Sequence, residues 1–163
     1  MDVASNGQAT GFCGPACHPP SRRLGSAMAD LVFFYGTLMR GFERLGRARL
    51  NEQLEPIGRG SIPAALFDLG LYPAAIPATD SRVWGEVNRM LEPDVVLPRL
   101  DEIEGFSASE PVTSLYTREE IPVTMSDGSV VRAWVYFYNA PLGRAERITS
   151  GDYFEHLRAR RHA

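Results

Sequence analysis

The stretch Leu31-Val32-Phe33-Phe34-Tyr35-Gly36-Thr37-Leu38 decides the fold and the kind of function expected of this chain. Its first four residues form an apolar run that is typical of a buried strand. The run ends abruptly in a turn that carries an aromatic residue, a glycine and a hydroxyl. Glycine permits backbone angles that residues with a Cβ avoid, so such a loop can direct successive backbone N–H groups toward an oxygen atom. The junction therefore predicts a receptor loop for a small molecule.

Length and composition predict one compact domain. The chain has 163 residues, of which 44% are hydrophobic and 23% are charged. These values are ordinary for a globular protein, and a chain of this length buries roughly two-thirds of its unfolded surface. Residues 1–27 are rich in Gly, Pro, Ser and Ala and lack periodicity, so we expect a disordered extension or an added remnant there. The folded domain is expected at residues 28–163.

Charge and hydropathy argue against nucleic acid and membrane partners. The net charge is −3, and all 17 basic residues are arginines spread thinly along the chain. No apolar stretch approaches the roughly 20 residues that span a bilayer, and none resembles the core of a secretory signal. We therefore expect a cytoplasmic protein with a small-molecule partner, and the sequence leaves its oligomeric state open.

Neither cysteine is expected to bind a metal. Cys13 and Cys17 are separated by three residues, and no second ligand pair follows them. Both lie in the N-terminal segment, so no disulfide can link parts of the core. The sequence predicts no metal site and no cofactor.

The pattern of the chain from residue 29 onward predicts an α+β fold dominated by a sheet or barrel. Short apolar runs are separated by Gly, Pro and Asp, and helical periodicity is limited. The predicted strands are residues 31–35, 58–69, 74–77, 83–90, 115–125 and 130–138. The predicted helices are residues 44–53, 94–103 and a third that starts at 150 or 151 and ends at 160.

A second candidate for chemistry is the acidic segment Leu100-Asp101-Glu102-Ile103-Glu104-Gly105-Phe106, which ends the second predicted helix. Glu104 stands next to Ile103 and close to Phe106. A carboxylate held against apolar side chains has its charged form disfavoured, which suits a general base near neutral pH. A solvated acidic helix end is the alternative interpretation of these residues.

The ordered set of motifs resembles the γ-glutamylcyclotransferase-like family, and more narrowly its γ-glutamylamine cyclotransferase and avirulence-induced-gene branch. The resemblance covers nearly all of residues 29–153. It rests on Tyr35-Gly36-Thr37-Leu38, Arg40-Gly41, Gly85-Glu86-Val87, Leu100-Asp101, Glu104-Gly105, Tyr116 with Arg118, Tyr136 with Tyr138, and Ile148 with Ser150-Gly151-Asp152-Tyr153.

The resemblance implies a small mixed β-barrel flanked by short helices, and it implies roles for particular residues. Tyr35, Gly36, Thr37 and Leu38 would form the pocket loop, and Glu104 would be the catalytic acid/base. A tyrosine on the following strand, Tyr116, could lend a hydroxyl to the pocket. Arg40 and Arg118 are possible partners for a substrate carboxylate.

The sequence departs from the family pattern in two places. Asn88 stands where a tyrosine commonly ends the Gly-Glu-Val-Tyr strand, and residues 107–114 separate Glu104 from Tyr116 rather generously. These departures bear on the shape of the substrate more than on the catalytic role.

The chemistry that the resemblance implies needs no nucleophile from the protein. The α-amine of a γ-glutamyl compound attacks its own γ-carbonyl, closes 5-oxoproline and expels an amine. Holding the substrate in this geometry can lower the barrier by up to roughly 7–11 kcal/mol. Glu104 would accept the ammonium proton and return it to the leaving nitrogen. The loop amides would hold either the α-carboxylate or the developing oxyanion, and the sequence leaves both open.

A rival hypothesis keeps the same fold and removes the reaction. In that case the pocket binds a small carboxylated metabolite without converting it, because function resides in the site and not in the fold. The position of Glu104 discriminates between the two. A carboxylate that faces the cavity beside the loop amides favours catalysis, and one turned into solvent favours the binding module.

Overall fold

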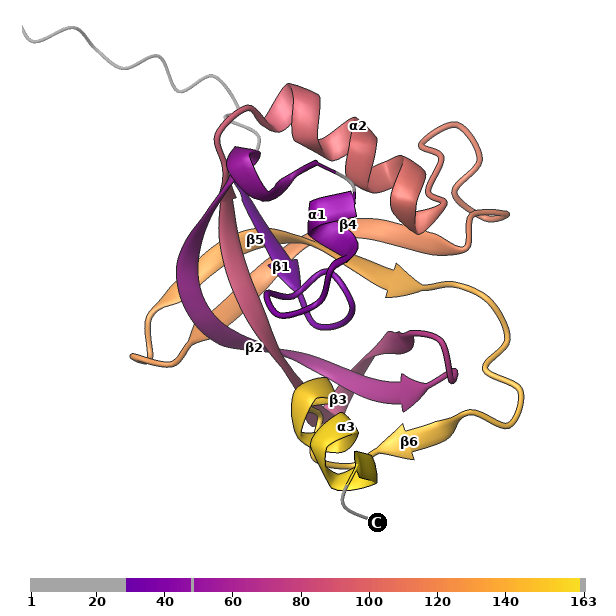
Figure 1. Cartoon of the computed structure of the whole chain (residues 1–163). Helices are drawn as coiled ribbons and strands as arrows, with labels where there is room; N and C mark the ends of the chain where they lie inside the picture. Colours follow the sequence, from indigo (N-terminus) through magenta and orange to yellow (C-terminus); the bar gives the residue numbers. More distant parts are fainter. Residues whose placement is uncertain (1–28, 48, 162–163) are drawn as a thin grey trace, which may run out of the picture.

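A closed β-barrel forms the body of the computed structural model, which describes residues 29–47 and 49–161 (Figure 1). Its strands are β1 (Leu31–Phe34), β2 (Leu54–Asp68), β3 (Pro73–Met90), β4 (Tyr116–Met125), β5 (Val130–Tyr138) and β6 (Glu146–Ile148). Its helices are α1 (Arg44–Arg47), the 3-10 turn η1 (Asn51–Gln53), α2 (Pro93–Glu104) and α3 (Tyr153–Arg161).

The barrel closes through five strands in the order β3-β1-β5-β4-β2, because β2 also pairs with β3. The contact of β1 with β5 is parallel and the other pairings are antiparallel, so the barrel is mixed. The outer strand β6 pairs only with β2. The predicted fold class, a small mixed β-barrel flanked by short helices, is confirmed. Side chains that fill it include Phe33, Ile62, Val87, Val123 and Val135, each almost wholly buried.

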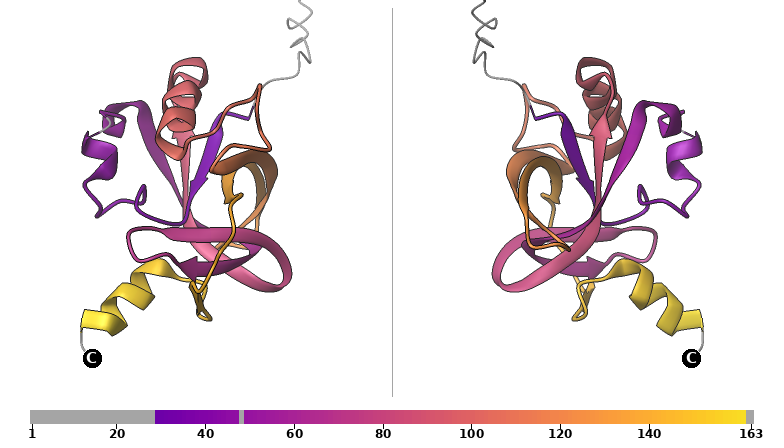
Figure 2. Two further views of the ribbon diagram at one scale, coloured as in Figure 1. Left: turned by 90° about the vertical axis from the view of Figure 1, so that its right-hand side faces the viewer. Right: turned by 90° about the vertical axis from the view of Figure 1, so that its left-hand side faces the viewer.

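The hairpin of β2 and β3 is longer than the barrel and continues into a second layer. Pro63 pairs with Arg82 and Ala64 pairs with Pro77, so residues 78–81 of β3 bulge out of the ladder. One end of the hairpin lies in the barrel beside β1, and the other carries β6 and α3 (Figure 2). The prediction of separate strands at 74–77 and 83–90 was therefore wrong, because β2 pairs with both segments and joins them into one strand.

One predicted helix was also wrong, and one strand was missed. Residues 44–53 do not form one helix, because Arg49 has a left-handed backbone (φ 56°) that separates α1 from η1. The strand β6 was missed, since three residues are too few to show a period. Helix α2 extends one residue beyond the predicted range at each end, and it ends at Gly105, whose φ is 65°.

Helix α3 is fastened to the far end of the hairpin by Asp68. This buried carboxylate accepts a hydrogen bond from His156 Nε2 at 2.8 Å, another from the Gly70 amide at 2.7 Å, and an ion pair from Arg160. Burial acts to raise the pKa of Asp68, but the hydrogen bonds from His156 and Gly70 outweigh it and leave that pKa below its ordinary value. Among the described residues, no helix has the length and apolar character required to cross a membrane.

Candidate functional site

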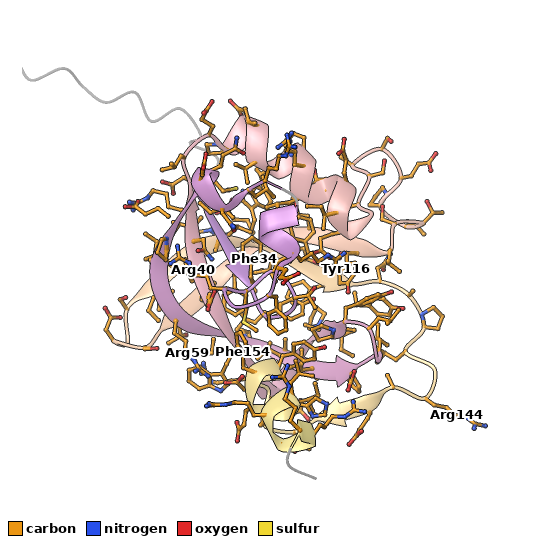
Figure 3. The ribbon with its side chains drawn as sticks, viewed as in Figure 1. Phe34, Arg40, Arg59, Tyr116, Arg144 and Phe154 are labelled. Atoms are coloured by element: carbon orange, nitrogen blue, oxygen red, sulfur yellow. The ribbon has the colours of Figure 1, made fainter. Side chains whose placement is uncertain are left out.

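A narrow cavity of about 30 Å³ opens at the mouth of the barrel, where β1 ends. Three elements meet there: the loop that follows β1, the tip of the β2–β3 hairpin, and the C-terminal end of α2. The cavity is lined by Phe33, Phe34, Tyr35, Gly36, Thr37, Leu38, Arg44, Tyr72, Pro73, Glu104, Tyr116 and Tyr136. The pocket loop of residues 35–38, Glu104 and Tyr116, which come from three distant parts of the chain, all line this one cavity. Figure 3 labels Phe34 and Tyr116, two of its lining residues.

The loop of residues 35–38 turns tightly as it leaves β1. The Met39 amide donates to the Gly36 carbonyl at 2.9 Å, which closes the turn. The amide N–H groups of Thr37 and Leu38 take part in no hydrogen bond among the described residues. Two residues that line the cavity therefore carry backbone donors that no described group uses, as an oxygen receptor requires.

Gly36 is needed in this loop for a different reason from the one predicted. It is not among the glycines with positive φ, so backbone freedom does not explain it. A Cβ at this position would lie 2.6 Å from Cγ of Pro73. Glycine is required because the hairpin tip packs directly against the loop.

Glu104 is the last residue of α2, and its side chain lines the cavity together with the loop. Burial raises the pKa of Glu104 to about 7, while the nearby Arg44 guanidinium acts in the opposite direction. A carboxyl group with this pKa exchanges its proton readily near neutral pH, which is the property a general acid/base needs. Ile103 and Phe106, the apolar neighbours expected from the sequence, are not among the residues that line the cavity, and Phe106 lies against Arg118 instead.

Arg44 is a lining residue that the sequence did not reveal. Its Nη1 donates to Thr37 Oγ1 at 3.0 Å, and its Nη2 donates to the Ile103 carbonyl at 3.5 Å. The guanidinium therefore joins the loop to the end of α2 and places a positive charge beside Glu104. No motif spacing marks this arginine, because its position depends on how residues 39–44 fold back over the barrel.

The two predicted tyrosines shape the wall of the cavity through their hydroxyl groups. Tyr35 donates to the Tyr136 carbonyl at 2.8 Å, and Tyr116 donates to the Pro73 carbonyl at 3.2 Å. Burial is the main reason that the pKa of each phenol is raised above its ordinary value of 10.0. Both hydroxyls therefore keep their protons, and both hold backbone in place.

The two arginines considered as carboxylate partners lie off this cavity. Arg118 donates to both carboxylate oxygens of Asp101, at 2.7 and 2.9 Å, and its guanidinium lies 4.9 Å from the ring centre of Trp134. Arg40 is exposed on the other side of the loop, away from Tyr116 (Figure 3). The positive charge at the cavity comes from Arg44 instead.

No group of His, Cys, Asp and Glu side chains in the described part of the chain could hold a metal ion. The N-terminal segment predicted to be disordered, with Cys13 and Cys17, lies outside the described residues.

Comparison with known proteins relates this architecture to one family. The family model described as "Gamma-glutamyl cyclotransferase, AIG2-like" matches residues 32–155, which include every residue of the cavity. A protein of Methanocaldococcus jannaschii, named provisionally as a γ-glutamylcyclotransferase, is 27% identical over 125 residues, covering 76% of this chain and 95% of that protein.

Solved structures share the fold. The protein ytfP of Escherichia coli superposes with a TM-score of 0.55 at 28% identity, covering 78% of this chain and 98% of that one. An AIG2-like protein of Mus musculus has a TM-score of 0.53 at 23% identity, covering 69% of this chain and 80% of that one. The family match covers most of the chain and spans the barrel, the loop after β1 and the glutamate at the end of α2. This chain therefore belongs to the AIG2-like γ-glutamyl cyclotransferase family.

Proposed function

We propose that the protein is a metal-free cyclotransferase that releases 5-oxoproline and an amine from a γ-glutamyl amine or γ-glutamyl amino acid. The observation that carries the proposal is the position of Glu104. Its carboxyl group, whose pKa burial raises to about 7, shares one cavity with Thr37 and Leu38, whose amides have no hydrogen-bond partner in the described part of the chain. A carboxylate that faces the cavity supports catalysis over the non-catalytic binding module.

The proposed reaction begins with proton transfer. Ionised Glu104 accepts a proton from the α-ammonium group of the substrate, and the freed nitrogen attacks the γ-carbonyl carbon. A carbon–nitrogen bond forms and closes the ring, and negative charge develops on the former carbonyl oxygen. Protonated Glu104 then gives its proton to the leaving nitrogen as the original amide bond breaks. The ring nitrogen gives up its second proton to the Glu104 carboxylate, the released amine takes that proton up and leaves as an ammonium ion, and neither water nor a cofactor is consumed.

Two kinds of donor lie around the reacting group in this scheme. The amides of Thr37 and Leu38 and the guanidinium of Arg44 supply positive potential, which suits the substrate α-carboxylate or the developing oxyanion. Tyr35 and Tyr116 hold the cavity wall through their bonds to backbone carbonyls.

The test is to incubate the full chain with a panel of γ-glutamyl amines and γ-glutamyl amino acids and to measure 5-oxoproline. We expect turnover of at least one member, with kcat/KM rising as the pH increases through about 7, because the starting enzyme needs ionised Glu104. If the panel binds but no 5-oxoproline forms, the binding module is the correct function.

A further inference from the structure

A second and larger cavity lies on the outer face of β3, beneath the segment that follows the pocket loop. Its volume is about 340 Å³, and it is lined by Arg40, Gly41, Phe42, Asn51, Leu54 and Asn88. It shares no residue with the cavity that contains Glu104. In Figure 2 the α1 side of the molecule, where this segment runs, is opposite the side formed by β4 and β5. The proposed reaction makes no use of this space.

Asn88 is the unusual residue of this cavity. It lies in the middle of the sheet, where it pairs with Val32 of β1 and Pro56 of β2, and it is only 2% exposed. Its side-chain Nδ2 is buried and has no hydrogen-bond partner. An amide that has lost its water and gained no partner destabilises the folded protein. The other buried side-chain atom without a partner in the described part of the chain is an acceptor, Oε1 of Gln53, and Gln53 does not line this cavity. A ligand in the cavity can therefore supply the acceptor that Asn88 lacks.

The other polar groups of the cavity are also donors of hydrogen bonds. Arg40 uses its backbone amide to bind Glu86 at 2.9 Å, but its guanidinium makes no ion pair or hydrogen bond with any described residue. Asn51 adds a second side-chain amide at the rim. No carboxylate lines this cavity, and that of Glu86 lines the neighbouring one. The side chains therefore offer a positive charge and amide donors without a protein acceptor of opposite charge.

The rest of the lining is apolar and firmly held. The ring of Phe42 stacks on Phe154 of α3 at 4.8 Å and on Tyr153 at 5.9 Å between ring centres. Leu54 is buried at the start of β2. These two side chains form a surface for a carbon skeleton next to the polar donors. The volume lies at the lower end of the range found for small-molecule sites, roughly 300–1,000 Å³.

We propose that this cavity is a second binding site, which takes a small molecule bearing an oxyanion. Nδ2 of Asn88 has almost no accessible surface while the cavity is empty, so the amide group turns about its terminal side-chain bond to donate to the ligand oxygen at the buried end. The guanidinium of Arg40 compensates the negative charge at the open end. The shared chemistry is that of a carboxylate or a phosphate group, and the planar fork of arginine fits both.

The experiment follows the side-chain amide signals of Asn88 by NMR in the full chain while inorganic phosphate or glutarate is added in separate titrations. We expect the Asn88 signals to shift and to saturate with one of the two probes, which identifies the source of the oxyanion. Arg40→Gln and Asn88→Leu should each weaken this binding by about tenfold or more, and for Asn88→Leu the titration follows the side-chain amide signals of Asn51, which also lines the cavity. Asn88→Leu keeps the size of the side chain and removes both of its N–H donors. Arg40 is exposed, so Arg40→Gln leaves the packing of the core unchanged.

Arg89→Gln is the matched control, because it removes the same charge from the next residue of β3, which is exposed and pairs with Asp30 and Glu55. Its binding should equal that of the unaltered protein. The proposal is overturned if neither probe shifts the Asn88 signals. It is also overturned if the shifts do not saturate, or if Arg40→Gln and Asn88→Leu bind the probes as well as the unaltered protein does.

Discussion

Replacing Glu104 by glutamine should make the protein more stable at high pH. The substitution keeps the shape of the side chain and removes its charge. Burial raises the pKa of Glu104 to about 7 from an ordinary value of 4.5. Each tenfold change in an ionisation constant corresponds to about 1.4 kcal/mol, so ionising this group costs the folded protein about 3 kcal/mol relative to the unfolded chain.

The sign of the effect follows from proton binding. Between about pH 4.5 and about pH 7 the folded protein holds a proton on Glu104 that the unfolded chain has released. The free energy of unfolding therefore falls as the pH rises through this window, and the whole penalty is present above it. The glutamine variant has no such penalty. Its advantage should be close to zero at about pH 4.5 and about 3 kcal/mol at about pH 8.

Urea unfolding followed by tryptophan fluorescence measures this difference. With a slope of about 2 kcal/mol per molar urea, the midpoint of Glu104→Gln should exceed that of the unaltered protein by roughly 1–2 M at about pH 8. Glu102→Gln is the control, since it makes the same charge change at an exposed position of α2. An advantage of Glu104→Gln that is equal at both pH values, or a loss of stability at about pH 8, would refute a buried carboxyl with a raised pKa.

Three further substitutions test the supporting structure. Tyr35→Phe removes the hydroxyl that donates to the Tyr136 carbonyl and should lower the free energy of unfolding by about 1–2 kcal/mol, measured by urea unfolding. Gly36→Ala places a Cβ 2.6 Å from Pro73 and should cost about 1–3 kcal/mol, with weaker binding of γ-glutamyl substrates measured as a higher KM. Asp68→Asn should reduce stability at neutral pH, and its deficit should shrink as the pH falls below about 4, because the lowered pKa of Asp68 stabilises the fold only while the group is ionised.

Each of these substitutions has a control or a contrary result. Tyr138→Phe removes a hydroxyl that makes no hydrogen bond among the described residues, and it should leave stability within about 0.5 kcal/mol. A Tyr35→Phe protein as stable as Tyr138→Phe would contradict the role given to the hydroxyl. For Gly36, unchanged stability and KM would contradict the close approach of Pro73. For Asp68, a deficit that persists undiminished in acid would show that the charge is not responsible.

The barrel could be predicted from its strands, but the connections between them could not. The residues of β1 and β5 show strand patterns that need no partner to be recognised. The continuity of β3 depends on its pairing with β2 over both segments, which a local pattern does not contain. The break between α1 and η1 depends on the left-handed backbone of Arg49, a conformation that arginine rarely adopts.

The predicted site residues line one cavity. They could be predicted because each belongs to a motif of the resemblance, and these motifs form the loop, the helix end and the strand at the mouth of the barrel. The contribution of Arg44 could not be seen, since its contacts with Thr37 and Ile103 form only after the segment following the loop folds back. The reason that position 36 needs glycine was also predicted wrongly. Pro73, which approaches Gly36 from the hairpin tip, is distant in sequence, so the sequence does not show the contact. Arg118 illustrates the reverse case, where a conspicuous charge is already paired with Asp101.

The rate of 5-oxoproline release by Glu104→Gln, compared with the unaltered protein and with Glu102→Gln, tests the central claim most directly. The measurement uses a γ-glutamyl compound that the unaltered protein converts, at a pH near 8, after both variants are shown to be folded. We predict that Glu104→Gln loses roughly 10²- to 10⁴-fold in kcat, while Glu102→Gln keeps its rate. A Glu104→Gln protein that retains the full rate would contradict the assignment of Glu104 as the acid/base.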